Sequence, residues 1–152
     1  MMNRRDFVRN ALGASALAII APRVLHATAP IAMTVYKSPI CGCCKEWIKH
    51  VEKNGFAVKA IDMDDPTPMR RTAGVPLNMA SCHTALVGAY VVEGHVPADL
   101  IKQMLAEKPA IRGLAVPGMI AGTPGMEDGG PPRPYQVMAF MKDGSSRLYA
   151  TR

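Results

Sequence analysis

The chain is poor in aromatic residues, which make up 5% of its 152 residues. This scarcity argues against a nucleic-acid surface on which bases stack against aromatic side chains. Long hydrophobic runs are also missing, because the most apolar segment, 11–21, is too short to cross a bilayer as a helix. Low-complexity stretches and interdomain linkers are missing too, so the length predicts one domain with a tail. Thirteen glycines and thirteen prolines predict short elements and many turns.

The N-terminus has the order of an export signal. The pair Arg4-Arg5 precedes the apolar segment 11–21, and Ala27 supplies a small residue for cleavage. Charged, apolar and small-residue regions in this order are typical of a signal peptide, and the paired arginines resemble the twin-arginine type. We expect residues 1–27 to be removed after Ala27. A short amphipathic helix or an uncleaved anchor is the alternative.

Removal of that segment changes the charge of the chain. Residues 1–27 hold four arginines and one aspartate, so their loss lowers the net charge from +6 to +3. A domain of residues 28–152 with this charge and no basic run gives little reason to expect nucleic-acid binding. We expect this domain to lie in the periplasm without stable insertion into the membrane.

Three of the four cysteines stand at the start of a predicted helix. The sequence Cys41-Gly42-Cys43-Cys44 follows a predicted strand over 31–36 and leads into an amphipathic segment that Asn54-Gly55 closes. Trp47 lies on the apolar stripe and is expected to pack behind the cysteine turn, while His50 lies on the polar face and is expected to be solvated. The positive end of a helix favours thiolate, so the position suits reactive or metal-binding sulfur.

The remaining elements complete an α/β fold. The patterns predict strands at 56–61, 84–87 and 90–93, a short helix from Asp65-Pro66 to near Gly74, a helix over 97–107, and a hairpin of strands 135–141 and 146–150. We therefore predict a mixed sheet flanked by helices, with a C-terminal extension, 110–152, that adds a β-hairpin. This extension carries two Pro-Gly-Met turns, which contain Met119 and Met126.

The order strand, helix, strand, helix, strand, strand, helix is similar to that of thioredoxins. The sequence Cys41-Gly42-Cys43-Cys44-Lys45 resembles the thioredoxin motif Cys-Gly-Pro-Cys-Lys, and Cys82-His83-Thr84 precedes the third strand. Thioredoxin-like folds have a loop at this place that lies against the cysteine motif. The resemblance implies that Cys82 and His83 approach the three helix cysteines.

Four blocks together resemble a bacterial family catalogued as domain of unknown function 411. In chain order they are Ser38-Pro39-Ile40-Cys41-Gly42-Cys43-Cys44, Ser81-Cys82-His83-Thr84, Glu93-Gly94-His95-Val96-Pro97 and Gly113-Leu114-Ala115-Val116-Pro117-Gly118-Met119. The resemblance covers residues 31–150. It implies a metal-binding protein associated with copper resistance, without implying a firm activity.

The sulfur-rich residues predict a soft-metal site. Thiolate sulfur prefers Cu(I) and also binds Zn²⁺, so Cu(I) is the expected ion and Zn²⁺ the second candidate. The predicted ligands are Cys41, Cys43, Cys44, Cys82 and His83. His95, Met119 and Met126 are further candidates, although each has a structural role as its alternative. A copper exporter, a copper chaperone or a thiol reductase would be the protein partner.

Two other interpretations of the cysteines remain open at this stage. A periplasmic thiol-disulfide oxidoreductase would use Cys41 as the exposed attacking thiol and Cys44 as the buried resolving thiol. A structural role would pair Cys41 with Cys44 and Cys43 with Cys82. The extra ligands crowded around the motif favour metal binding. The chain offers no nucleophile and base outside the cysteines, so a binding protein is favoured over an enzyme.

Overall fold

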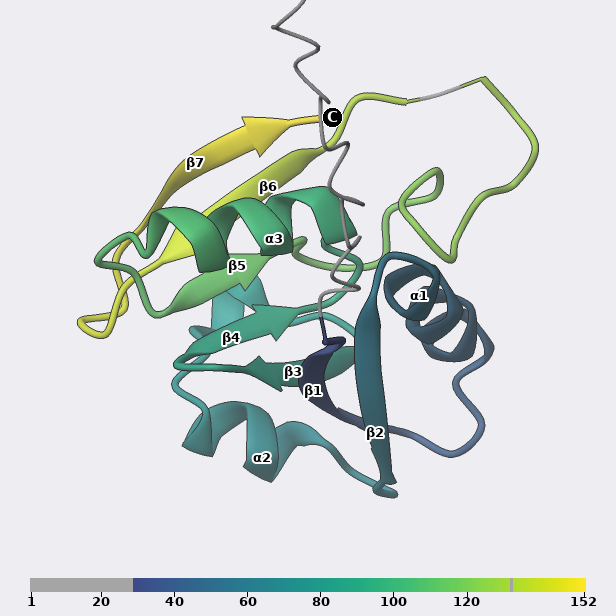
Figure 1. Cartoon of the computed structure of the whole chain (residues 1–152), viewed down its shortest axis with the longest axis horizontal. Coiled ribbons are helices and arrows are strands. Elements are labelled where there is room, and N and C mark those ends of the chain that lie inside the picture. The colour runs from purple at the N-terminus through teal and green to yellow at the C-terminus, as the bar shows by residue number, and fades with distance from the viewer. Residues whose placement is uncertain (1–28, 132) are drawn as a thin grey trace, which may run out of the picture.

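The computed structural model describes residues 29–131 and 133–152 (Figure 1). The predicted signal peptide, 1–27, lies outside the described residues. The elements are β1 (Ile31–Lys37), α1 (Gly42–Lys53), β2 (Phe56–Asp62), α2 (Thr67–Thr72), the 3₁₀ turn η1 (Leu77–Met79), β3 (His83–Val87), β4 (Tyr90–Glu93), α3 (Ala98–Glu107), β5 (Gly113–Ala115), β6 (Gln136–Phe140) and β7 (Ser146–Thr151). No helix in this part of the chain is long and apolar enough to cross a membrane.

All seven strands form one mixed sheet in the order β2-β1-β3-β4-β5-β6-β7. The pairs β1–β2 and β4–β5 are parallel, and the other neighbours are antiparallel. The predicted α/β class, the element order up to α3 and the C-terminal hairpin are confirmed. The likeness to thioredoxins themselves stays a prediction.

The sequence patterns missed β5 and η1, which have three residues each. β5 lies in a Gly/Pro-rich stretch and is too short for a periodic signal. It is a strand because it pairs with β4 on one side and β6 on the other. The C-terminal hairpin therefore continues the main sheet through β5.

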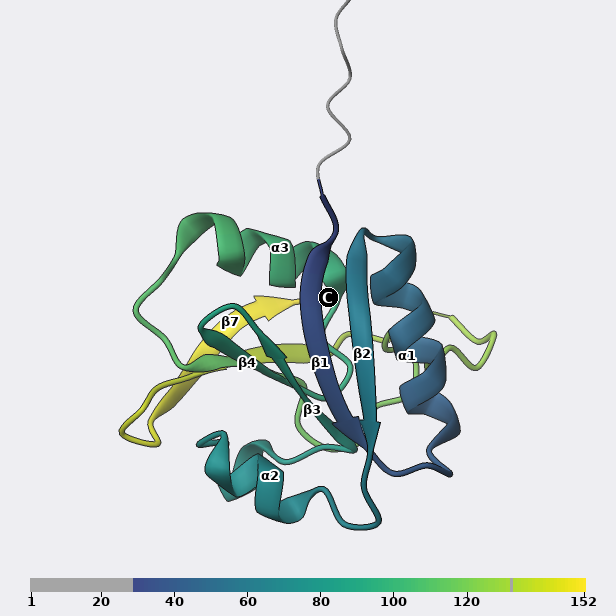
Figure 2. The same ribbon diagram turned by 60° about the horizontal axis from the view of Figure 1, so that its bottom comes forward.

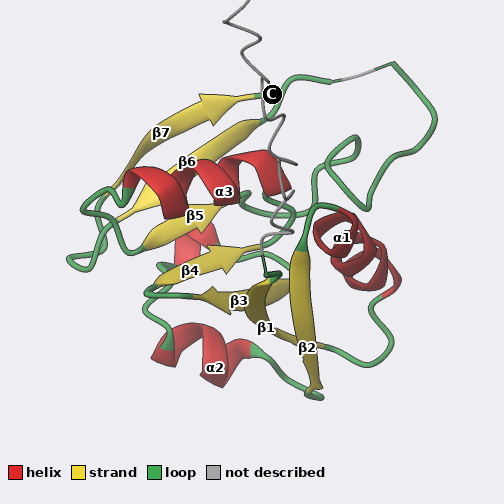
Figure 3. Ribbon diagram, viewed as in Figure 1, coloured by secondary structure: helices red, strands yellow, loops and turns green. Residues whose placement is uncertain are grey.

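Helices cover both faces of the sheet, as Figures 2 and 3 show. The apolar sides of α1 and α3 pack together on one face, with Trp47 and Val51 from α1 and Leu100, Ile101 and Met104 from α3. The segment of α2 and η1 covers the other face through a smaller cluster that contains Ala73, Val75 and Met79. Burial of these side chains supplies the main driving force for the fold.

The loops that carry the cysteines, His95 and the two Pro-Gly-Met turns lie at one edge of the sheet. β1 runs toward this edge, and its antiparallel partner β3 starts there. β4 runs antiparallel to β3 and parallel to β5, so both of these strands end at the same edge. The cysteine turn after β1, Cys82 before β3, His95 after β4 and the Pro-Gly-Met loop after β5 must therefore meet.

Candidate metal centre

The cysteine turn is built into the N-terminus of α1. Cys41 is the N-cap residue, and its sulfur accepts a hydrogen bond from the Cys44 N–H at 3.3 Å. A disulfide joins Cys41 to Cys44, while Cys43 and Cys82 are free thiols. Cys41 and Cys43 are half-buried and Cys44 is fully buried. Cys82 is half-buried as well, so both free thiols and the Cys41 end of the disulfide are partly exposed to solvent.

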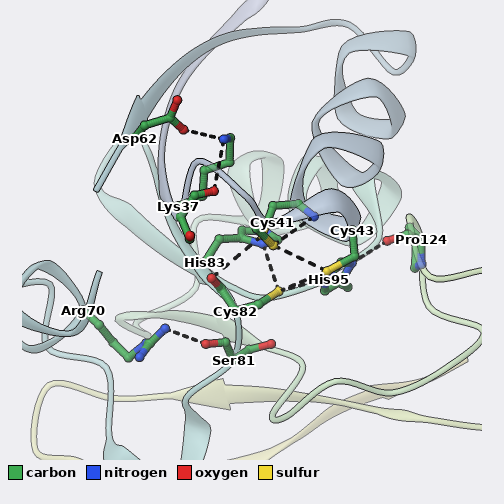
Figure 4. The surroundings of a disulfide bond; sticks show 12 residues. Lys37, Cys41, Cys43, Asp62, Arg70, Ser81, Cys82, His83, His95 and Pro124 are labelled. Atoms are coloured by element: carbon green, nitrogen blue, oxygen red, sulfur yellow. Dashed lines mark hydrogen bonds and ion pairs between the residues drawn. A yellow bond between two sulfur atoms is a disulfide. The ribbon is translucent and has the colours of Figure 1, made fainter. Parts of the chain in front are cut away.

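Cys82 joins this turn from the other segment, as predicted. Its Sγ lies 4.0 Å from the Sγ of Cys43, and its carbonyl oxygen lies 3.9 Å from the Sγ of Cys44 (Figure 4). The sulfur atoms of all four cysteines lie within 4.8 Å of one another. The hypothesis of two structural disulfides is wrong in its second bridge, because a disulfide needs sulfurs about 2.0 Å apart.

Two buried histidines flank Cys82. His83 Nδ1 lies 3.4 Å from the Cys82 sulfur, and His95 Nε2 lies 3.0 Å from the same atom. His83 Nε2 is buried and has no hydrogen-bond partner among the described residues. His95 Nδ1 lies 2.7 Å from the Pro124 carbonyl oxygen, to which it can only donate. That bond leaves the lone pair of His95 on Nε2, facing the sulfur, an arrangement common in metal-binding histidines.

Burial determines the protonation of this group. It lowers the pKa of His83 to about 3 and also lowers the pKa of His95, so both rings are neutral and carry a free lone pair. Burial, followed by the neighbouring Cys43, raises the pKa of Cys82 to about 12. The thiolate character expected at a helix N-terminus therefore does not extend to Cys82. A metal ion bound there must displace its proton.

The Pro-Gly-Met loop contributes backbone to the site. Met119 is 62% exposed and Met126 is half-buried. The contacts of this loop with the site run through Pro124, which binds His95, and through Gly125. A Cβ on Gly125 would lie 2.5 Å from the backbone N of Trp47, so the loop rests directly on the first turns of α1.

Trp47 packs behind the cysteine turn as predicted. It is fully buried, its Nε1–H donates to the Val96 carbonyl at 2.9 Å, and its ring centroid lies 4.3 Å from that of His83. The expectation for His50 is wrong. His50 is half-buried and its Nε2 accepts the Ala98 N–H at 3.2 Å. The reason is that Pro97, the N-cap of α3, has no side-chain acceptor, and His50 supplies one.

Two ion pairs that the sequence analysis missed, one half-exposed at Asp62 and one largely buried, support the two cysteine segments. Lys37 pairs with Asp62 and donates to the Ser38 carbonyl at 3.3 Å, the same oxygen that accepts the Cys41 N–H at 3.1 Å. Arg70 pairs with Glu93 beneath the Cys82 segment. Burial raises the pKa of Glu93, while bonds from neighbouring groups oppose that shift. The sequence did hold a signal for these pairs, because β1 ends at Lys37 and β4 ends at Glu93, each a charged residue after an apolar run.

Comparison with other proteins identifies relatives of the chain. The family model described as "Protein of unknown function, DUF411" matches residues 79–126, which include Cys82, His83 and His95. Two solved structures, both named Copper resistance protein copG (Form 1 and Form 2), are each 43% identical to the chain. Each match covers 81% of the present chain and 98% of the copper resistance protein's chain, with a TM-score of 0.76. Among curated proteins, none matches the sequence. The family membership that the four sequence blocks predicted is therefore confirmed, and the chain belongs to the DUF411 family.

Proposed function

We propose that the chain binds Cu(I) in copper handling or resistance, through the thiols of Cys41, Cys43, Cys44 and Cys82. The observation that carries this proposal is the meeting of four sulfur atoms, from two distant segments, within 4.8 Å of one another. Soft thiolate sulfur prefers Cu(I) among the common biological ions. The relatives named copper resistance proteins, at 43% identity, support copper over Zn²⁺.

Nitrogen donors extend the proposed site on its buried side. His83 and His95 form a second ligand group with Cys82, whose atoms also lie within 4.8 Å of one another. Both rings are neutral, so each offers a lone pair without first losing a proton. We assign His83 as the first additional ligand and His95 as the next. Met119 and Met126 rank behind them, because the loop reaches the site through its backbone.

Cu(I) binding by all four sulfurs requires that the Cys41–Cys44 bond be open. Two electrons and two protons convert that disulfide into two thiols, and a dithiol protein would supply them while it becomes a disulfide itself. An oxidising compartment such as the periplasm makes such a donor necessary. A thiol reductase is therefore one proposed partner, beside a copper exporter or a copper chaperone that passes the ion on.

The alternative of a thiol-disulfide oxidoreductase gains no support from the relatives, because neither is named as one. The arrangement also contains more donors than such an enzyme uses. Disulfide exchange at Cys41 and Cys44 has no need of Cys82 or of two neutral histidines beside it. The metal proposal accounts for these groups.

We further propose that residues 1–27 direct export and that residues 28–152 form the metal-binding domain. The support is the N-terminal order of paired arginines, apolar segment and small residues. The described fold begins just after this segment, with β1 at Ile31.

The decisive experiment is an anaerobic Cu(I) titration of the reduced protein against a chromophoric chelator. We expect Cys43→Ser and Cys82→Ser each to weaken the affinity at least ~10-fold, because each removes a soft ligand. Met119→Leu is the matched control, since it removes an exposed sulfur and should leave the affinity unchanged. Undiminished affinity in both serine variants would refute the proposed site. Native mass spectrometry of the same samples counts bound copper and free thiols together.

A further inference from the structure

The residue before Cys82 is held by all three of its polar groups. The Ser81 N–H donates to Glu93 Oε1 at 2.7 Å, and the Ser81 carbonyl accepts from Arg70 Nη2 at 2.5 Å. Its hydroxyl donates to the Gly118 carbonyl. These partners come from α2, from β4 and from the loop after β5. Figure 4 shows Arg70 directed at Ser81, with Cys82 immediately beyond it.

Arg70 and Glu93 act on Ser81 as one unit. Arg70 Nε donates to Glu93 Oε1 at 2.7 Å, and Thr84 Oγ1 donates to Glu93 Oε2 at 2.6 Å. The Arg70 and Glu93 side chains are 13% and 0% exposed. The guanidinium thus places one N–H on the carboxylate and another on the Ser81 carbonyl, while the carboxylate takes the Ser81 N–H. A lysine has a single nitrogen on a flexible stem and cannot make both contacts in this geometry.

Backbone packing limits where Ser81 can sit. Gly94 has φ +71°, and a Cβ there would lie 2.6 Å from the Ser81 Cβ and 2.8 Å from the Val116 carbonyl oxygen. The Gly94 N–H also donates to the His83 carbonyl at 2.9 Å. Ser81 therefore packs directly against the strand end that carries Glu93, which limits where the peptide that leads into Cys82 can lie.

We propose that Arg70 and Glu93 are positioning residues of the metal site, which hold the Ser81 peptide from both sides and so place the Cys82 sulfur between Cys43 and His95. This inference rests on the proposed copper function where it is tested by Cu(I) affinity, and it is independent of that function where it is tested by the reactivity of the Cys82 thiol. We call Arg70 and Glu93 together the Ser81 clamp. The distances that it would maintain are 4.0 Å from Cys82 Sγ to Cys43 Sγ and 3.0 Å from Cys82 Sγ to His95 Nε2.

Stability alone gives a weak reason for this pair. Removing two charges from water costs about as much as their attraction returns, and apolar residues of similar volume often stabilise a core equally well. The pair instead supplies directed donors and acceptors to one peptide group, which apolar side chains cannot do. Groups that orient metal ligands in this way typically contribute about 10- to 100-fold to metal affinity.

The test compares Arg70→Lys with Arg112→Lys. Arg112 is also half-buried near α2, and its Nε donates to the Ala73 carbonyl at 2.8 Å, so it controls for the loss of a guanidinium on this face. Thermal unfolding of both variants measures the structural cost. We expect Arg70→Lys to lower Cu(I) affinity about 10-fold, and Arg112→Lys to leave it unchanged at a similar loss of melting temperature.

A second readout needs no copper. In the form with the Cys41–Cys44 disulfide, mass spectrometry follows alkylation of the two free thiols, Cys43 and Cys82. Arg70→Lys should raise the alkylation rate of Cys82 relative to Cys43 several-fold, because the released segment exposes the sulfur, and Arg112→Lys should not. Glu93→Gln, which keeps an acceptor for the Ser81 N–H, should show a smaller rise and serves if Arg70→Lys folds poorly.

The outcomes separate this inference from the proposed function. If wild-type protein fails to bind Cu(I), the proposed function fails, and the alkylation ratio still decides whether Arg70 positions Cys82. If wild-type protein binds Cu(I) and Arg70→Lys leaves both affinity and alkylation ratio at wild-type values, the positioning role is refuted. Equal losses in Arg70→Lys and Arg112→Lys, in proportion to their melting temperatures, would refute it as well.

Discussion

Replacement of Gly125 by alanine tests how the C-terminal loop is attached to the cysteine helix. Gly125 has φ +84°, and an added Cβ would lie 2.5 Å from Trp47 N and 2.9 Å from both the Cys43 carbonyl oxygen and Trp47 Cα. These are backbone atoms of α1, and an ordinary contact for a Cβ is roughly 1 Å longer. Because Trp47 is fully buried, α1 cannot withdraw without disturbing the core.

Two costs add up at this position. A non-glycine residue with this φ loses about 1–2 kcal/mol, and forcing a methyl group against packed atoms costs about 1–3 kcal/mol more. We therefore expect Gly125→Ala to lower the free energy of unfolding by about 2–5 kcal/mol. Gly129 is the matched control in the same loop, since its φ is +72° and nothing lies within 4 Å of its added Cβ. Gly129→Ala should cost about 1–2 kcal/mol.

Urea denaturation followed by tryptophan fluorescence is the assay, because Trp47 is the single tryptophan and lies in the affected helix. If the loop escapes the clash by lifting off, the bond from His95 to the Pro124 carbonyl breaks, and Cu(I) affinity should fall together with stability. Equal destabilisation by Gly125→Ala and Gly129→Ala would refute the close approach of the loop to α1.

Two further predictions concern acid and export. Burial lowers the pKa of His50, His83 and His95 in the folded chain, so the unfolded chain binds more protons in acid, and metal-free protein should lose stability as the pH falls below about 6.5. For the fully buried His83, with a pKa of about 3, the free energy of unfolding falls by about 1.4 kcal/mol for each pH unit between about 6 and about 4. Urea denaturation at about pH 7 and about pH 5, with a chelator present, measures this loss of stability. Equal stabilities at the two pH values would contradict the prediction. Changing Arg4-Arg5 to Lys-Lys should leave precursor in the cytoplasm on immunoblots of cell fractions, whereas normal export would exclude the twin-arginine assignment.

Local patterns in the sequence were enough to predict most of the helices and strands. The helix of Cys43 and Cys44 follows from an apolar stripe and an Asn-Gly end, and the C-terminal hairpin follows from a turn signal between two β-rich runs. These signals act over a few residues and need no tertiary partner. β5 carried no such signal, because three residues become a strand only through the neighbours that pair with them.

The approach of Cys82 to the helix cysteines was predicted through resemblance to folds that bring these two segments together. Spacing alone, a sequence separation of 38 from Cys44 to Cys82, contains no such information. The resemblance did not extend to the partners of each side chain. His50 was expected in solvent and instead caps α3, because the need of that helix end for an acceptor arises only once the two helices pack.

The sequence by itself determined the donor types and the elements that carry them: three cysteines at the start of a helix, and a Cys-His pair where a strand begins. Tertiary structure alone decided which of these donors are neutral, which are protonated and what holds them in place. Burial gives His83 a lone pair and Cys82 a proton, and burial is a property of the packed sheet edge. The clamp of Arg70 and Glu93 on Ser81 likewise exists only because α2 and β4 flank one peptide group, and no local pattern in the chain encodes that distance.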